Sequence, residues 1–259
     1  MIKKIIPLKL RQFIRVLLHP RAYYWLQKEK VTYGQDLLYT HHSAGFLDDA
    51  RFMEAYEIGK ALDRGILLKG VYDIHWRMHT LCWAATLVQG LEGDFVDCGV
   101  CGGMYARTVM HYVDFQTLDK KYYLLDTFTG LDPKYSSDDE MIKNEKFGYR
   151  KVIGLYEHVQ KAFRDFNVDI IQGSVPDTLP QVTTERICYL SIDMNSVYPE
   201  IAALEFFWDK IVPGGVIILD DYGFANNRDQ KVAHDEWAAT KQIKILSLPT
   251  AQGLIIKSR

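Results

Sequence analysis

The sequence predicts an open α/β sheet that is mostly parallel, ends in an antiparallel hairpin and follows a helical N-terminal region. From residue 94, short apolar runs alternate with helical segments, which is typical of parallel strands joined by helical crossovers. The last two runs, KILSL and GLIIK, are separated only by PTAQ. That linker is too short for a crossover, so the two runs are expected to pair antiparallel. Over residues 47–92, apolar residues recur three and four apart, which indicates helices.

These patterns divide the chain into three parts. Residues 1–30 are a basic amphipathic extension, residues 31–93 a helical region that covers the site, and residues 94–259 the sheet domain. A chain of 259 residues is long for one domain and short for two. One catalytic-sized domain with an extension is therefore expected.

The extension concentrates positive charge. Residues 1–30 hold eight Lys or Arg residues against Glu29 alone, a net charge of +7, whereas the whole chain is at −2. Apolar residues at helical spacing between Pro7 and Pro20 predict a short amphipathic helix. Such a helix packs on its own domain or on a sister subunit of a homo-oligomer, or residues 1–20 contact an anionic membrane surface.

Composition limits the compartment and the partners. The net charge of −2 and the pI near 6.4 argue against nucleic acid, whose binders carry a basic domain or stripe. Four cysteines do not make a disulfide framework, no cleavable signal is recognisable, and no uninterrupted apolar run reaches the length of a membrane span. We expect a cytoplasmic protein, peripheral to the membrane only if residues 1–20 bind it.

The elements of the sheet domain follow in order. Strands are expected at residues 94–100, 121–126, 168–173, 186–193, 215–221, 244–248 and 253–257, and helices at residues 104–113, 151–163, 199–211 and 229–240. The polar stretch from Thr127 to Lys151 is expected to be a loop, which covers the cofactor or selects the acceptor, or else is a plain surface loop.

The first strand ends in a glycine-rich turn, FVDCGVCGGMY at residues 95–105. Met104 and Tyr105 stand where a triphosphate-binding loop has Lys and Ser or Thr, and the dinucleotide pattern G-x-G-x-x-G is absent. Asp97 followed by Gly99 and Gly103 suits a ligand that needs close backbone approach without phosphate neutralisation. S-adenosylmethionine is such a ligand, and a purely structural strand-to-helix turn is the alternative.

The second strand also ends in an acid. Asp126 lies 23 residues after Gly103, at the position where a carboxylate on the neighbouring strand tip can accept both ribose hydroxyls. This spacing supports a nucleoside-bearing ligand.

Three further acids end the next two strands. Asp193 ends YLSID, and Asp220 and Asp221 end GGVIILDD. Because carboxylates at adjacent strand tips repel one another, a cation is expected between them, and an all-oxygen set favours Mg²⁺ or Mn²⁺. The alternative for Asp221 is that it caps the following helix.

These segments resemble a known family. DFVDCGVCGGMYAR, LLDTFTGL, SIDMN and VPGGVIILDDYG are similar to the macrocin O-methyltransferases, a metal-dependent branch of the class I S-adenosylmethionine methyltransferases with a Rossmann-like sheet. The resemblance implies that Asp126 holds the ribose, that the turn faces the methionine part, and that Asp193, Asp220 and Asp221 hold Mg²⁺. The expected cofactor-binding set is Asp97, Gly99, Gly103, Asp126, Thr127 and Ser174.

The chain departs from the family pattern at two places. Members that act on antibiotic sugars carry Arg-Gly-Gly in the first turn and D-x-D-x-Y after the fourth strand. Here the first turn reads Gly102-Gly103-Met104, and Asn195 replaces the second acid. We therefore expect O-methylation of a hydroxyl on a sugar, glycan or other small molecule, without a commitment to a macrolide.

The mechanism implied by the resemblance needs a base. A sulfonium methyl group is already activated, so the enzyme mainly orients the hydroxyl and raises its ionised fraction. Asp193 is the first candidate for the base. A histidine is the second, and four of the eight lie in the region before the sheet, namely His41, His42, His75 and His79. Within it, HWRMH at residues 75–79 is interpreted as part core and part site wall.

Two rival classes share parts of this pattern. A nicotinamide-dependent oxidoreductase would have the same early sheet and ribose acid, but the missing fingerprint and the three strand-end acids argue against it. A non-catalytic binding module on the same fold would not need all three acids.

Cys98 and Cys101 form a C-x-x-C without two further ligands at zinc spacing, so no zinc site is expected.

Overall fold

The computed structural model describes residues 31–63, 73–147 and 152–258, with the side chains of residues 146 and 147 excepted. The predicted amphipathic helix of residues 1–30 lies outside the described residues. The chain forms two units, residues 1–44 and residues 45–259, which are treated separately below.

The described part of the first unit is a two-stranded antiparallel hairpin. It consists of β1 (Tyr33–Gln35) and β2 (Leu38–Thr40). Asp36 and Leu37 join the strands with φ angles of +51° and +60°, the left-handed values that a tight two-residue hairpin requires. The sequence patterns do not predict this hairpin.

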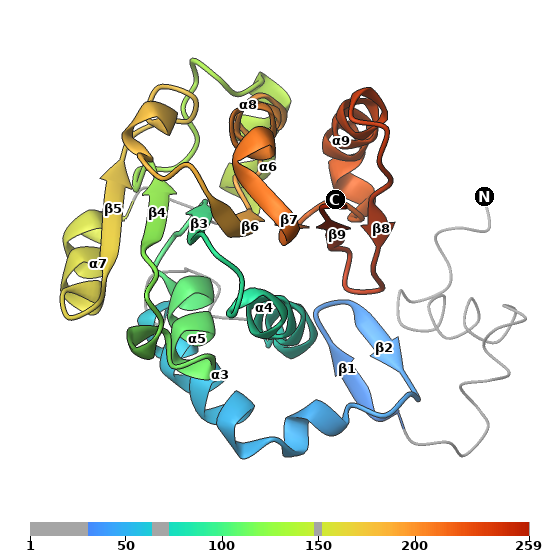
Figure 1. Ribbon diagram of the computed structural model, residues 1–259. Coiled ribbons are helices and arrows are strands. Elements are labelled where there is room, and N and C mark those ends of the chain that lie inside the picture. Colours follow the sequence, from blue (N-terminus) through green and yellow to red (C-terminus); the bar gives the residue numbers. More distant parts are fainter. Residues whose placement is uncertain (1–30, 64–72, 148–151, 259) are drawn as a thin grey trace, which may run out of the picture. The chain divides into compact units, whose positions relative to one another are not determined.

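The second unit is built on one sheet, shown in Figure 1. Seven strands belong to it among the described residues: β3 (Asp94–Cys98), β4 (Tyr122–Asp126), β5 (Val168–Gln172), β6 (Ile187–Ile192), β7 (Ile211–Leu219), β8 (Leu246–Ser247) and β9 (Gly253–Ile256). Their order is β5-β4-β3-β6-β7-β9-β8. The strands β3 to β7 are parallel, whereas β9 pairs antiparallel with both β7 and β8. The predicted mostly parallel sheet with a terminal antiparallel hairpin is confirmed.

Helices cover both faces of the sheet. The α-helices are α3 (Ala50–Asp63), α4 (His75–Val88), α5 (Met104–Tyr112), α6 (Asp138–Phe147), α7 (Leu155–Phe163), α8 (Val197–Phe207) and α9 (Arg228–Thr240). Side chains of α3, α4, α5 and α7 share one apolar core with one face, and those of α8 and α9 share a second core with the other face. Phe95 and Val96, neighbours on β3, enter different cores because side chains alternate along a strand.

Short 3₁₀ turns complete the connections: η2 (Gly45–Asp48), η3 (Phe115–Thr117), η4 (Leu179–Gln181), η5 (Trp208–Lys210) and η6 (Ala225–Asn227). The predicted helices before the sheet are observed as α3 and α4. None of the helices in the described ranges is long and apolar enough to cross a bilayer.

The stretch after β4 differs from the sequence prediction, because the expected loop of residues 127–151 contains α6. Ser137 and Glu140 begin this helix with a reciprocal cap: the Ser137 N–H donates to Glu140 Oε2 at 2.7 Å, and the Glu140 N–H donates to Ser137 Oγ at 3.3 Å. This Ser-x-x-Glu capping box was the local signal for a helix start. The acidic first turn, with Asp138 and Asp139, favours the same start through the helix dipole.

Candidate active site

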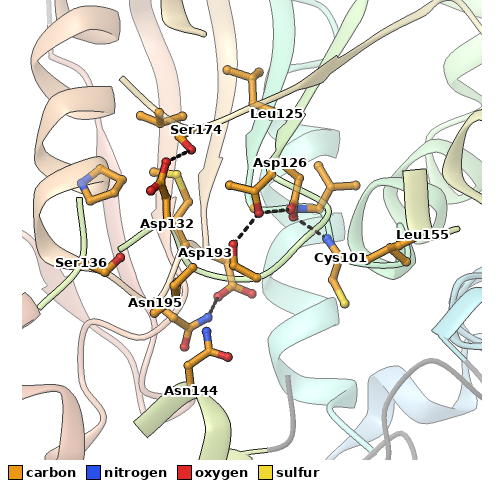
Figure 2. Close-up of a pocket in the computed structure, with 18 of the residues that line it drawn as sticks. Cys101, Leu125, Asp126, Asp132, Ser136, Asn144, Leu155, Ser174, Asp193 and Asn195 are labelled. Carbon is orange, nitrogen blue, oxygen red and sulfur yellow. Dashed lines mark hydrogen bonds between the residues drawn. The ribbon is translucent and has the colours of Figure 1, made fainter. Parts of the chain in front are cut away.

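A cavity lies at the carboxyl ends of the parallel strands, where the chain leaves β3, β4, β5 and β6 (Figure 2). The strand order reverses between β3 and β6, which is where open α/β sheets bind ligands. Five residues predicted from the sequence line this cavity, namely Gly99, Asp126, Thr127, Ser174 and Asp193. The fold therefore brings most of the predicted cofactor set together.

Gly99 is required by the neighbouring strand. Its φ is +94°, and a Cβ at this position would lie 1.9 Å from the carbonyl oxygen of Asp193. The Asp193 N–H donates to the carbonyl of Cys98 at 2.8 Å, which joins the tips of β3 and β6. Only glycine permits both the backbone angle and this approach.

Two residues of the predicted set, Gly103 and Asp97, are absent from the cavity lining among the described residues. Gly103 has a φ of +98° at the start of α5, and a Cβ there would lie 2.6 Å from the ring of Phe163. Asp97 is 2% exposed and accepts a hydrogen bond from the Tyr122 hydroxyl at 2.9 Å. Burial raises the pKa of Asp97 to about 7. Both residues contact the core behind the turn.

Asp126 holds the glycine turn in place. Its Oδ2 accepts the N–H groups of Val100 at 2.7 Å and Cys101 at 2.8 Å, and its Oδ1 accepts that of Phe128 at 2.6 Å. Figure 2 shows Asp126 beside the turn that carries Cys101. A carboxylate offers about four acceptor positions and these N–H groups take three of them, so at most one remains for a ligand hydroxyl. The Thr127 hydroxyl lies 3.4 Å from Oδ1, beside that position.

A further acid completes this side of the cavity. Ser174, after β5, donates its hydroxyl to Asp132, and that hydrogen bond is the main reason why the pKa of Asp132 is lowered. Thr127 donates its hydroxyl to the carbonyl of Gly130 at 2.6 Å. Asp132 lies in the stretch expected to be a plain loop or a cover, and no spacing rule distinguished it from the other acids there.

The three predicted metal-binding acids do meet. One carboxylate oxygen each from Asp193, Asp220 and Asp221 lies within 4.8 Å of the others. Asp193 is half-buried, and its pKa is raised well above the ordinary value, first by burial and then by repulsion from Asp220 and Asp221. Three crowded oxygen donors with excess negative charge fit a hard divalent cation.

Asp220 also has partners within the chain. Arg77 Nη1 lies 2.5 Å from Asp220 Oδ2, and the Tyr105 hydroxyl donates to the same oxygen at 3.0 Å. Gln252 Nε2 donates to Oδ1 at 3.0 Å. Asp220 is 1% exposed, so this arginine offsets a charge that burial would otherwise destabilise. The segment HWRMH had suggested a site wall, but nothing in the sequence pairs Arg77 with Asp220.

The histidines of α4 have other surroundings. The His75 ring lies 4.1 Å from that of Tyr56, and the His79 ring stacks on Phe46 at 4.4 Å. Burial lowers the pKa of both histidines, and neither is among the described residues that line the cavity. His41 and His42 belong to the other unit. Asp193, whose Oδ1 accepts a hydrogen bond from Asn195 Nδ2 at 3.1 Å, is thus the candidate base that lines the cavity.

The strand order, the glycine turn and the cavity at the switch point define the class of protein: this is the class I methyltransferase fold. The solved structures of the O-methyltransferase NovP and of the calicheamicin methyltransferase CalS11 are similar to it. NovP has a TM-score of 0.62 at 19% identity and covers 84% of this chain and 100% of its own. CalS11 has a TM-score of 0.56 at 15% identity and covers 84% of this chain and 94% of its own.

The family follows from the sequence match. Residues 75–246 match the model of the family described as Macrocin-O-methyltransferase (TylF), so the chain belongs to this family. Mycinamicin III 3''-O-methyltransferase of Micromonospora griseorubida is 27% identical over 196 residues, which are 70% of this chain and 75% of that protein. A second relative, from Streptomyces olivaceus, is the 8-demethyl-8-(2,3-dimethoxy-alpha-L-rhamnosyl)-tetracenomycin-C 4'-O-methyltransferase. It is 27% identical over 165 residues, which are 60% of this chain and 61% of that protein. The chain is an S-adenosylmethionine-dependent O-methyltransferase.

Proposed function

We propose that this enzyme methylates a hydroxyl of a sugar, on a small molecule or a glycan, with Mg²⁺ or Mn²⁺ bound by its three strand-end acids. The observation that carries the proposal is the cluster of Asp193, Asp220 and Asp221 next to the cavity. The names of two relatives support the sugar, since one specifies a rhamnosyl compound and the other the 3'' position of mycinamicin III.

The cofactor is assigned to the side of the cavity formed by Gly99, Asp126, Thr127 and Ser174. Asp126 accepts three N–H groups of the turn and of the segment after β4, and its one remaining acceptor position suits a ribose hydroxyl. Gly99 lets the turn pack against the tip of β6, and this holds the turn at the cavity lining, where the methionine part is assigned. Asp97 and Gly103 are assigned a supporting role beneath the turn.

The metal is assigned to the tips of β6 and β7. When bound, a hard divalent cation supplies positive charge that lowers the pKa of a neighbouring hydroxyl. Asp193 lines the cavity, and its carboxylate accepts the proton that the hydroxyl loses as the methyl group transfers. Asn195 holds this carboxylate in one orientation through its amide. Arg77 limits the repulsion among the acids by pairing with Asp220.

The test is methyl transfer to a panel of glycosides, measured as S-adenosylhomocysteine release with and without EDTA. We expect EDTA to abolish transfer but to leave calorimetric binding of S-adenosylhomocysteine intact. Asp193→Asn and Asp221→Asn should reproduce this separation, with a loss on the order of a hundredfold or more for Asp193→Asn, which also removes the base.

Asp165→Asn is the matched control, because that side chain is 76% exposed on the surface. It should leave both measurements unchanged. Full transfer in EDTA, with both cluster variants near the wild-type rate, would overturn the metal-dependent mechanism.

A further inference from the structure

A second cleft adjoins the active-site cavity. It is bounded by α6 and by the first turns of α8 and α9. Tyr135, Asn144 and Asn195 line both spaces, and the last two are labelled in the close-up of Figure 2. The cleft therefore continues from the cavity to the surface of the unit.

The cleft lies next to Asp193, the proposed base. Asn195 lies in its wall and donates a hydrogen bond to Asp193 Oδ1 at 3.1 Å. The glycine turn and Ser174 line the first cavity but not this cleft. A molecule in the cleft would therefore lie against Asn195, the hydrogen-bond partner of Asp193, and not against the glycine turn or Ser174.

Two aromatic rings give the cleft a flat wall. The rings of Tyr135 and Tyr198 stack with their centroids 5.5 Å apart and an interplanar angle of 9°. Tyr198, on the first turn of α8, is 57% exposed, so much of its ring surface remains in contact with water. A tyrosine ring can cover the apolar C–H face of a sugar while the tyrosine hydroxyl stays hydrated.

Polar side chains surround this wall. Asn144, Asn227 and Asp229 belong to the lining. Amide and carboxylate groups supply the donors and acceptors that a ring of hydroxyl groups needs. A flat aromatic surface with such groups is the chemistry of a carbohydrate site, whereas an apolar aglycone would need a more continuous hydrophobic lining.

The walls are fixed before a ligand arrives. The Tyr135 hydroxyl donates to Asp177 Oδ1 at 2.5 Å, and Lys134 Nζ lies 4.5 Å from the centre of the Tyr135 ring. Glu140 of α6 accepts the N–H of Val197, the first residue of α8, at 2.8 Å. Because α6 and α8 are tied together, binding here loses little additional conformational freedom.

From this arrangement we infer that the cleft binds the carbohydrate part of the acceptor, with Tyr198 as its stacking platform and α6 as the element that selects the sugar. The inference rests on the proposed function and adds the place and the chemistry of acceptor binding. Tyr198 is assigned as a specificity-determining residue that does not take part in the methyl transfer itself.

The test compares Tyr198→Ala and Tyr198→Phe with the wild type. Stacking of this kind contributes about 0.5–1.5 kcal/mol, so Tyr198→Ala should raise the KM for the glycoside roughly two- to twelvefold at an unchanged kcat. Tyr198→Phe should retain the wild-type KM, because it keeps the ring. The affinity for S-adenosylhomocysteine should be equal in all three proteins.

Trp83→Ala is the control, since Trp83 is another exposed aromatic residue, 44% accessible on α4 and outside the cleft. Saturation-transfer NMR with methyl α-L-rhamnopyranoside and S-adenosylhomocysteine supplies a readout that does not need turnover. We expect a saturable signal with the wild type and with Trp83→Ala, and a weaker one with Tyr198→Ala.

The outcomes separate the two proposals. Transfer to a glycoside with the same KM in Tyr198→Ala and wild type would overturn the acceptor cleft and leave the proposed reaction standing. Transfer only to acceptors without a sugar, together with no saturable rhamnoside signal, would overturn both the sugar assignment and the cleft.

Discussion

Replacing Gly99 by alanine tests how closely the glycine turn and the acidic cluster depend on one another. The added Cβ would lie 1.9 Å from the carbonyl oxygen of Asp193 and 2.5 Å from its carbonyl carbon. Since Cβ atoms essentially never approach other heavy atoms within 3.0 Å, the tips of β3 and β6 must separate by about 1 Å. The carboxylate of Asp193 moves with its backbone.

Gly99→Ala should lower the free energy of unfolding for two reasons. A left-handed φ of +94° costs an alanine roughly 1–2 kcal/mol. Separating the strand tips weakens the Asp193-to-Cys98 hydrogen bond and the packing beside it, for about 2–3 kcal/mol more. At roughly 2–4 °C per kcal/mol, the melting temperature should fall by about 10 °C.

Gly154→Ala supplies the matched control. Gly154 has a φ of +80°, but the nearest atom to its added Cβ is Glu157 Oε2 at 3.9 Å. This variant should show only the backbone cost, a fall of about 4 °C. Differential scanning calorimetry gives both shifts, and methyl transfer by Gly99→Ala should drop on the order of a hundredfold, because the reacting groups are displaced by about 1 Å. Equal melting temperatures for the two variants, with transfer retained in both, would refute the steric argument.

Three further predictions concern charge and capping. In Arg77→Met the buried Asp220 loses its arginine partner, so the melting temperature in EDTA should fall by roughly 10 °C. Millimolar Mn²⁺ should restore part of this loss. Arg107→Met is the control, because the guanidinium of Arg107 lies over the Phe166 ring, and its melting temperature should not respond to Mn²⁺. The pKa of Asp97 is about 7 in the folded chain, above its unfolded value, so the folded state keeps a proton that the unfolded state releases, and the free energy of unfolding should fall as pH rises from about 4 to 7. Urea unfolding of Asp97→Asn should show a flatter pH profile and greater stability than wild type at pH 8, on the order of 2–4 kcal/mol, and a parallel profile would contradict the assignment. Ser137→Ala should cost about 1 kcal/mol in urea unfolding and raise hydrogen exchange at the start of α6, and unchanged exchange there would show that the cap contributes nothing.

The sequence was sufficient to predict the sheet and the close approach of the three strand-end acids. Strand and helix periods are local properties, so β3 to β7 and the closing hairpin of β8 and β9 could be read in order. Asp193, Asp220 and Asp221 each end or follow a parallel strand, and parallel strands end at the same edge of a sheet. Their proximity also requires β6 and β7 to be neighbours, as strands consecutive in the chain usually are.

The helix α6 was missed although its signal is local. Its polar composition gives no apolar period, and the prediction relied on that period rather than on the capping box of Ser137 and Glu140. The same residues now form a wall of the cleft beside the cavity. A search for caps in polar segments would have found this element.

Other features of the site were decided by tertiary structure alone. The sequence left open whether a ligand or the fold requires the glycine turn. In the structure, a Cβ on Gly99 would meet Asp193, which follows β6, and a Cβ on Gly103 would meet Phe163 of α7. Arg77 lies 143 residues before Asp220 along the chain, and no periodicity links the two positions. Local patterns specify which strand tips carry charge, because strand length and alternation are encoded within a few residues. The backbone clearance around Gly99 and the cation that faces a buried acid depend on packing between elements far apart in the sequence, so only the folded chain determines them.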